Sequence, residues 1–154
     1  MKKKIIIALA DAFTNKIAKL VANDLGFYFL NLDEYIDYNI FDSERILAKC
    51  GIEYLKNQEV KYLQDALQLD DMLYYASYEL FVNNQKLFND YEKIYVALSR
   101  EQLIKLKEKN FEINDLAFED RDKFLKSIAI SVESDFLIEK SFANKIVTTL
   151  KKLS

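Results

Sequence analysis

The sequence contains no histidine, proline or tryptophan, and only two glycines and one cysteine among 154 residues. Without histidine, imidazole acid–base catalysis, nucleophile–histidine pairs and histidine metal ligands are excluded. Glycine supplies positive φ angles and close backbone approach, so its scarcity argues against loops that cradle phosphate. The single cysteine, Cys50, cannot form a disulfide within the chain, which favours a reducing, intracellular setting. We interpret Cys50 as a small buried apolar residue rather than a reactive thiol.

Charge and hydrophobicity narrow the class of protein further. Hydrophobic residues make up 51% of the chain and charged residues 31%, which is a globular composition. The net charge of −3 gives no electrostatic reason to expect a nucleic acid or an anionic membrane as partner. The basic start "MKKK" precedes an apolar run of only six residues, shorter than a secretory signal of roughly 7–15. No run approaches the ~20 apolar residues of a membrane span, so we expect a soluble cytoplasmic protein.

Hydrophobic periodicity predicts an alternation of strands and helices. Residues 4–10 form a continuous apolar run, which is typical of a strand buried on both faces in a parallel sheet. Apolar positions then recur with helical spacing from Phe13 to Leu25, and Gly26 stands where a helix C-terminal glycine belongs. The remaining strands are expected at 27–32, 72–77, 93–98 and 127–132. Further helices are expected from Glu34, with Asp33 as a candidate cap, on either side of Gly51 and over 82–90. Others are expected from Ser99, which opens an S-x-x-Q capping box, over 119–126 and at the C-terminal end.

This order of elements predicts the fold class. Strands that alternate with helices indicate an α/β domain, a three-layer α/β/α arrangement around a central parallel five-stranded sheet. No linker, repeat or low-complexity segment divides residues 1–154, so we expect a single domain and a monomer. Residues 109–119 show no clean period and are expected to form a loop. The Tyr-rich stretches at 35–41 and 74–81 are interpreted as core or covering residues.

Four separated stretches resemble, in order, the shikimate kinase family of P-loop small-molecule kinases. "LVANDLGFYFLNLDEYID" (20–37) is similar to the family's A-K-D-L-G-x-x-F-x-D-x-D-x-x-I-E, and "GIEYLKNQE" (51–59) to G-E-x-x-F-R-x-x-E. "KIYVALSREQLIKL" (93–106) resembles V-V-Y-L-x-x-S-P-E-x-L-x-x-R, and "EDRDKFLKSIAISV" (119–132) resembles x-E-R-x-P-L-Y-x-E-x-A-D-x-x-V. Their order and spacing carry the resemblance, which spans nearly the whole chain. The resemblance implies a P-loop kinase fold.

The same alignment places the family's phosphate loop on a stretch that lacks its functional residues. The pattern G-x-x-x-x-G-K-[ST]-[ST] falls on "ALADAFTNK", so that Ala8 and Phe13 replace the glycines. Thr14 replaces the phosphate-binding lysine, and Asn15 replaces the Mg²⁺-binding hydroxyl. We expect the Phe13 ring to add bulk beside the β-phosphate position, and Asp11 to add negative charge where a triphosphate would lie. We interpret the stretch as a phosphate loop that was lost.

Other family features are altered as well. The metal-side aspartate of D-x-D is Asn31 here, and Tyr78 adds bulk where the family's three glycines line the substrate pocket. The family's lid carries an Arg-Pro pair, whereas 110–118 contains neither residue. Because phosphoryl transfer depends on charge positioning and stabilisation, a chain without these groups has no visible means to catalyse it. We therefore expect no catalytic residue, no metal ligand and no cofactor.

Three residues match substrate-binding positions of the family. The resemblance implies that Asp33 accepts hydrogen bonds from ring hydroxyls, while the alternative is that it caps a helix. Arg121 matches a carboxylate-binding arginine, with a solvated surface charge as the alternative. Lys56 stands in for another such arginine without its two-pronged geometry, and a surface lysine near Glu53 and Glu59 is the alternative.

These observations favour a non-catalytic relative that binds a small carboxylated ligand or a protein partner. The alternative is a divergent kinase that phosphorylates shikimate or a similar hydroxy acid with ATP and Mg²⁺, using Lys16 or Lys19 in place of the missing lysine. A third possibility is an unrelated doubly wound fold such as a receiver domain, for which Asp11 fits but the end of the 72–77 strand does not.

Overall fold

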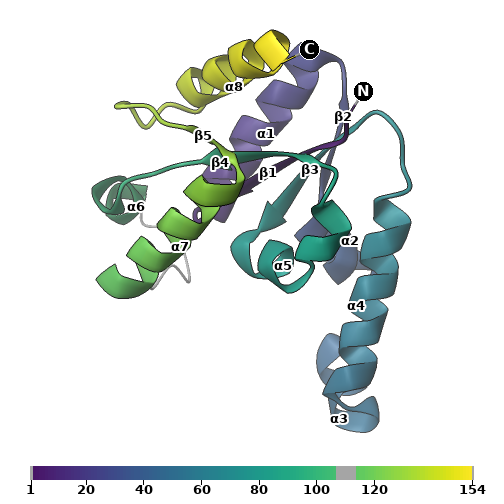
Figure 1. Cartoon of the computed structure of the whole chain (residues 1–154). Coiled ribbons are helices and arrows are strands. Elements are labelled where there is room, and N and C mark those ends of the chain that lie inside the picture. The colour runs from purple at the N-terminus through teal and green to yellow at the C-terminus, as the bar shows by residue number, and fades with distance from the viewer. Residues whose placement is uncertain (1, 107–113, 154) are drawn as a thin grey trace.

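The computed structural model describes residues 2–106 and 114–153 and contains one five-stranded parallel sheet (Figure 1). The strands are β1 (Lys4–Ala8), β2 (Tyr28–Asn31), β3 (Met72–Ser77), β4 (Glu92–Val96) and β5 (Ile130–Val132). Their order across the sheet is β2-β3-β1-β4-β5, and every neighbouring pair runs parallel. The predicted three-layer α/β/α fold is therefore confirmed.

Helices cover both faces of this sheet. The helices are α1 (Asp11–Leu25), α2 (Leu32–Asn39), α3 (Ser43–Cys50), α4 (Ile52–Ala66), α5 (Tyr78–Asn83), α6 (Arg100–Leu106), α7 (Asp115–Ile128) and α8 (Glu139–Leu153), with a 3₁₀ turn η1 (Gln85–Phe88). Helices α1 and α8 pack on one face, where the Phe13 and Phe142 rings meet edge to face at 5.6 Å. The opposite face is covered by residues of α2, α4, α5 and α7.

Strand β1 lies at the centre of the core because it is hydrogen-bonded on both edges and covered on both faces. Ile5, Ile6, Ile7 and Ala8 are fully buried. Since side chains alternate along a strand, Ile6 and Ala8 join the core beneath α1 and α8, while Ile5 and Ile7 join the opposite core. The continuous apolar run in the sequence is thus explained by burial on both sides.

The predicted helix ends are confirmed where a glycine or a capping box marks them. Gly26 has φ of +73° and its N–H bonds the last turn of α1, as a left-handed C-terminal glycine should. Gly51 has φ of +88° and separates α3 from α4. Ser99 and Gln102 make the reciprocal capping bonds at 3.1 and 3.0 Å that open α6.

Several element boundaries differ from the sequence prediction. Helix α7 starts at Asp115 and continues to Ile128, so it takes in part of the expected loop and shortens the last strand to Ile130–Val132. The helix expected over 82–90 is instead the end of α5 followed by η1. Residues 107–113, which include much of the expected loop, lie outside the described part of the chain.

Helices α3 and α4 form an arm that extends away from the sheet (Figure 1). Helix α3 contributes no buried residue, and its contacts are chiefly with α4. Cys50 lies at the end of α3 and is exposed, so the expectation that it is buried was wrong. The reason is that the local pattern carries no sign that α3 leaves the core. Within residues 2–106 and 114–153, no helix is long and apolar enough to cross a membrane.

The buried hydroxyl of Tyr74 offers a test of this core. It donates a hydrogen bond to the carbonyl of Ala66 at 2.7 Å and thereby ties the end of α4 to β3. We expect Tyr74→Phe to lower the free energy of unfolding by about 1 kcal/mol, because the Ala66 carbonyl loses the shorter of its two hydrogen bonds and keeps the one from the Leu69 N–H. Urea denaturation with an unchanged m-value measures this.

Tyr38→Phe is the matched control, since the Tyr38 side chain is 88% exposed. This variant should change the free energy of unfolding by less than about 0.5 kcal/mol. Equal losses in the two variants would contradict the assigned role of the Tyr74 hydroxyl.

Candidate functional site

The carboxyl ends of the parallel strands bring together polar residues that are distant in the sequence. Asn31 ends β2, Ser77 ends β3, and Asp11 opens the helix that follows β1. Because β2, β3 and β1 are adjacent and in parallel register, these residues meet at one edge of the sheet. In open α/β sheets this edge is where ligands bind, so it is the first candidate site.

The connection between β1 and α1 is short. Strand β1 ends at Ala8 and α1 begins at Asp11, so only Leu9 and Ala10 lie between them. Ala10 is the N-terminal cap of α1 and its side chain makes no capping bond. The stretch aligned with the family's phosphate loop is therefore mostly helix, and only two residues of it form a turn.

Two residues of that stretch face the core. Phe13 is 7% exposed and packs on Phe142 of α8, and Thr14 is fully buried. The Oγ of Thr14 is a buried polar atom without a hydrogen-bond partner among the described residues. Phe13 belongs to the core beneath α1 and α8, so the first turn of α1 directs this ring into the protein, and its relation to a phosphate position stays a prediction.

Two polar residues of the stretch, Asp11 and Asn15, accept hydrogen bonds from neighbouring side chains. The Tyr75 hydroxyl donates a hydrogen bond to the Asp11 carboxylate, which lies in the first turn of α1. A carboxylate in this position is stabilised by the positive end of the helix dipole. Asn15 accepts a bond from the Asn31 amide at 3.0 Å, so these two side chains join α1 to the end of β2. The start of α1 thus carries the negative charge of Asp11, and this carboxylate already accepts a hydrogen bond from Tyr75.

Asp33 makes the best-defined polar contact at this edge. Its two carboxylate oxygens accept bonds from the backbone N–H and the Oγ of Ser77, each at 2.7 Å. The alternative that Asp33 caps a helix was wrong. Asn31 is the N-cap of α2 and accepts from the Glu34 N–H at 3.1 Å, because α2 begins at Leu32, two residues earlier than expected. Asp33 instead fixes α2 to the start of α5.

The environment of Asp33 raises its carboxyl pKa. Burial is the largest cause and the Asp37 carboxylate adds to it, while the bonds from Ser77 act in the opposite direction. The folded chain therefore holds this proton more tightly than the unfolded chain does. The resulting stabilisation is present at low pH and is lost as the pH rises from the ordinary aspartate value through the raised one.

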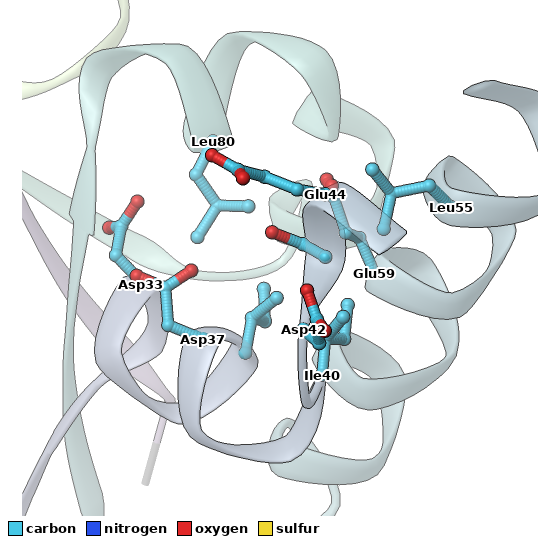
Figure 2. A pocket seen from close by; sticks show the side chains of 10 residues that line it. Asp33, Asp37, Ile40, Asp42, Glu44, Leu55, Glu59 and Leu80 are labelled. Atoms are coloured by element: carbon cyan, nitrogen blue, oxygen red, sulfur yellow. The ribbon is translucent and has the colours of Figure 1, made fainter. Parts of the chain in front are cut away.

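Asp33 lies at one end of a cleft of about 560 Å³ between α2, α3, α4 and α5 (Figure 2). Four apolar side chains line it, from Ile36, Ile40, Leu55 and Leu80. Carboxylates of Asp33, Asp37, Asp42, Glu44 and Glu59 surround the same hollow, and Ser43 completes the lining. None of these ten lining residues is Lys or Arg, so the cleft is acidic with an apolar floor.

The structure does not bring the other two predicted substrate residues into this cleft. Lys56 is exposed on α4 and is not among the lining residues, although its neighbours Leu55 and Glu59 are. Arg121 lies on α7, where it pairs with Glu79 at 3.3 Å and stacks over the Tyr78 ring at 4.5 Å. A carboxylated ligand of Arg121 would have to compete with Glu79.

A second polar hollow, of about 700 Å³, lies between α6, α7 and the chain after β5. Its lining includes both signs of charge, and some of these are paired: Lys126 contacts Asp122 at 3.0 Å and Glu133 at 3.4 Å. The buried Tyr95 hydroxyl donates to Asp122 at 2.7 Å, and burial together with this carboxylate raises the tyrosine pKa. These pairings compensate part of the charge that lines the second hollow. The described residues include no group of three or more acidic or cysteine side chains that could hold a metal ion.

Sequence reasoning missed most of the cleft. Asp37 had a local signal, because it follows Asp33 by four residues on one helix and so shares its face. Asp42, Glu44 and Glu59 had no such signal, since their position in the cleft depends on how α4 packs against α2 and α3 packs on α4. Ser77 could be found only from the pairing of β2 with β3.

The opposing influences on Asp33 predict pKa changes of opposite sign. Ser77→Ala should raise the pKa of Asp33 further, because it removes one bond to the charged form. Asp37→Asn should lower it, because it removes a neighbouring negative charge. A pH titration of the Asp33 carboxyl carbon by NMR measures both changes, with Ser127→Ala as the control that leaves it unchanged. Shifts in the same direction would contradict this account.

Comparison with known proteins gives a clear result for the fold only. The sequence matches no protein-family profile and no curated protein. Among solved structures, the shikimate kinase of Aquifex aeolicus is similar with a TM-score of 0.69 and 16% identity, over 96% of each chain. The shikimate kinase of Acinetobacter baumannii, solved in complex with shikimate, gives 0.67 and 14%, over 100% of this chain and 96% of the other. A gluconokinase of Sinorhizobium meliloti gives 0.63 and 10%, over 98% and 93%.

These likenesses span nearly the full length of both partners in each case. At identities of 10 to 16% they establish the fold and leave the activity open. The chain has the fold of the shikimate kinases and gluconokinases.

Proposed function

We propose that the chain is a shikimate-kinase-like protein that does not transfer phosphate from ATP and acts as a binding module. The observation that carries this proposal is the start of α1. Only Leu9 and Ala10 separate β1 from α1, and Phe13 and Thr14 are buried where a working loop needs glycine and lysine. A phosphate-binding loop needs backbone N–H groups that curl around the anion, and two residues give no such curve.

The charge at this position supports the same proposal. The Asp11 carboxylate lies in the first turn of α1 and accepts the Tyr75 hydroxyl bond. A triphosphate brought to this helix start would meet a negative charge instead of a lysine. The two basic residues further along α1, Lys16 and Lys19, are exposed. Lys19 lies over the Phe29 ring at 5.9 Å, and Lys16 is about 7 Å along the axis from the first residue of the helix.

The acidic cleft indicates which of the two expected kinds of ligand fits. A small carboxylated ligand would meet five carboxylates and no lysine or arginine within it. Lys56 and Arg121, the residues expected to bind a carboxylate, lie outside the lining. We therefore favour a protein partner over a small carboxylic acid. Neither a cofactor nor a metal ion is required, and the monomer is the unit that binds.

Titration calorimetry with MgATP at millimolar nucleotide tests the loss of the nucleotide site. We expect no heat of binding and no phosphorylation of shikimate in a coupled assay, because no group remains to hold the β- and γ-phosphates. The Aquifex aeolicus shikimate kinase, measured in parallel, is the positive control. ATP-dependent phosphorylation of shikimate above the rate without protein would overturn the proposal in favour of a divergent kinase.

A further inference from the structure

The ion pairs of the described residues leave the cleft carboxylates uncompensated. Those pairs use Glu79, Glu92, Asp122 and Glu133, and none of them includes an acidic residue of the cleft. Within the cleft, Asp33 is bonded to Ser77, and Asp42 accepts the Arg45 N–H at 3.3 Å at the start of α3. The donors are the Ser77 hydroxyl and the Arg45 backbone N–H, which are both neutral, so the negative charge of the cleft is not compensated.

The carboxylates come from separate helices and surround one apolar floor. Asp33 and Asp37 lie on α2, Glu44 on α3 and Glu59 on α4. Figure 2 shows them arranged around the hollow, with the Leu55 and Leu80 side chains at its sides. Like charges held together in this way repel, and a ligand with positive charge relieves that repulsion. The apolar floor adds a contact that a hydrated inorganic cation would not use.

Exposed apolar side chains also lie on and between the helices α2, α3 and α4, outside the cleft lining. Tyr38 and Phe41, which flank the lining residues in the sequence, are 88% and 90% exposed. Leu47 on α3 and Ile52 and Tyr54 on α4 are each about half exposed. Helix α3 buries no residue although its apolar side chains lie on one face. An occupant that extends beyond the cleft would cover this surface, whereas a small amine would cover only the floor.

We propose that the cleft between α2, α3, α4 and α5 docks a basic amphipathic segment of a partner protein. Lysine or arginine side chains of that segment pair with Asp37, Glu44 and Glu59, and its apolar face lies on Ile36, Ile40, Leu55 and Leu80. This is the helix-in-groove mode of recognition, with charge complementarity setting the sign of the partner. The inference rests on the proposed binding function and names the partner class.

The other occupants fit less well. A second copy of this chain carries a net charge of −3, and in a symmetric dimer through this face it would bring its own acidic cleft toward this one. A nucleic acid is excluded by the sign of its charge. The docked segment must therefore be more basic than this protein, and its binding must weaken as salt rises.

Fluorescence anisotropy with a labelled synthetic helix of alternating lysine and leucine faces tests the proposal. We expect the wild-type protein to bind this peptide, and a glutamate–leucine peptide of equal length not to bind. A lysine–serine peptide of equal charge should bind about tenfold more weakly, because it cannot use the apolar floor. Equal binding of the lysine–leucine and lysine–serine peptides would overturn the docking mode.

A cleft variant and a control variant of equal charge test whether the peptide binds in the cleft. The triple change Asp37→Asn, Glu44→Gln, Glu59→Gln should weaken binding about tenfold or more. The control Asp24→Asn, Asp70→Asn, Glu139→Gln alters the net charge equally outside the cleft, and its affinity should stay within about twofold of the wild type. Far-UV circular dichroism checks that both variants are folded. Equal loss in the two variants, or none in the cleft variant, would overturn the proposal.

Two further experiments distinguish the proposed peptide from the other possible occupants of the cleft. Sedimentation of the protein alone should give a monomer, and a dimer that excludes the peptide would overturn the proposal in favour of a second copy. Spermine that displaces the peptide at equal molar concentration would overturn it in favour of a small polyamine. The MgATP titration is independent of these peptide-binding experiments. Nucleotide binding without peptide binding, or the reverse, would show which of the two proposals fails.

Discussion

Burial of β1 on both faces and hydrogen bonding on both of its edges is the constraint on which the rest of the structure depends. Four of its five residues are fully buried apolar side chains, and β3 and β4 pair with it along its whole length. This central position divides the core in two and sets α1 and α8 on one face. It also brings Asp11, Asn31 and Ser77 to the same edge, because parallel strands end together.

The short turn after β1 follows from the same packing. Helix α1 must return across the sheet to bury Phe13, Ile17 and Val21, and its first turn already faces the core. Thr14 is fully buried in the same turn, although its hydroxyl has no hydrogen-bond partner among the described residues. The first turn of α1 is therefore part of the core. A ligand-binding loop in the same place would have to give up that contact with α8.

The opposite side of the sheet edge is organised around Asp33. Its bonds to Ser77 join α2 to the start of α5, and these two helices form one side of the acidic cleft. The arm of α3 and α4 supplies the other side. The fold that shikimate kinases and gluconokinases share carries here an acidic cleft with apolar lining residues, and only two residues separate its strand β1 from helix α1. Such a pairing of features is the basis for proposing binding in place of phosphoryl transfer.

The sequence by itself determined the order of strands and helices, the parallel sheet and the helix ends at Gly26 and Ser99, because these depend on local periodicity and local backbone geometry. The resemblance also led to the prediction that residues 8–16 replace a phosphate loop, which the MgATP titration tests. Only the tertiary structure decided that Thr14 is fully buried, that Asp33 bonds Ser77 rather than capping α2, and that Lys56 lies outside the cleft. Those outcomes depend on contacts between segments far apart in the sequence, such as Asp33 with Ser77, which are 44 residues apart. Local pattern carries no information about them, because the same helix face can meet any partner that the packing of the whole domain brings to it.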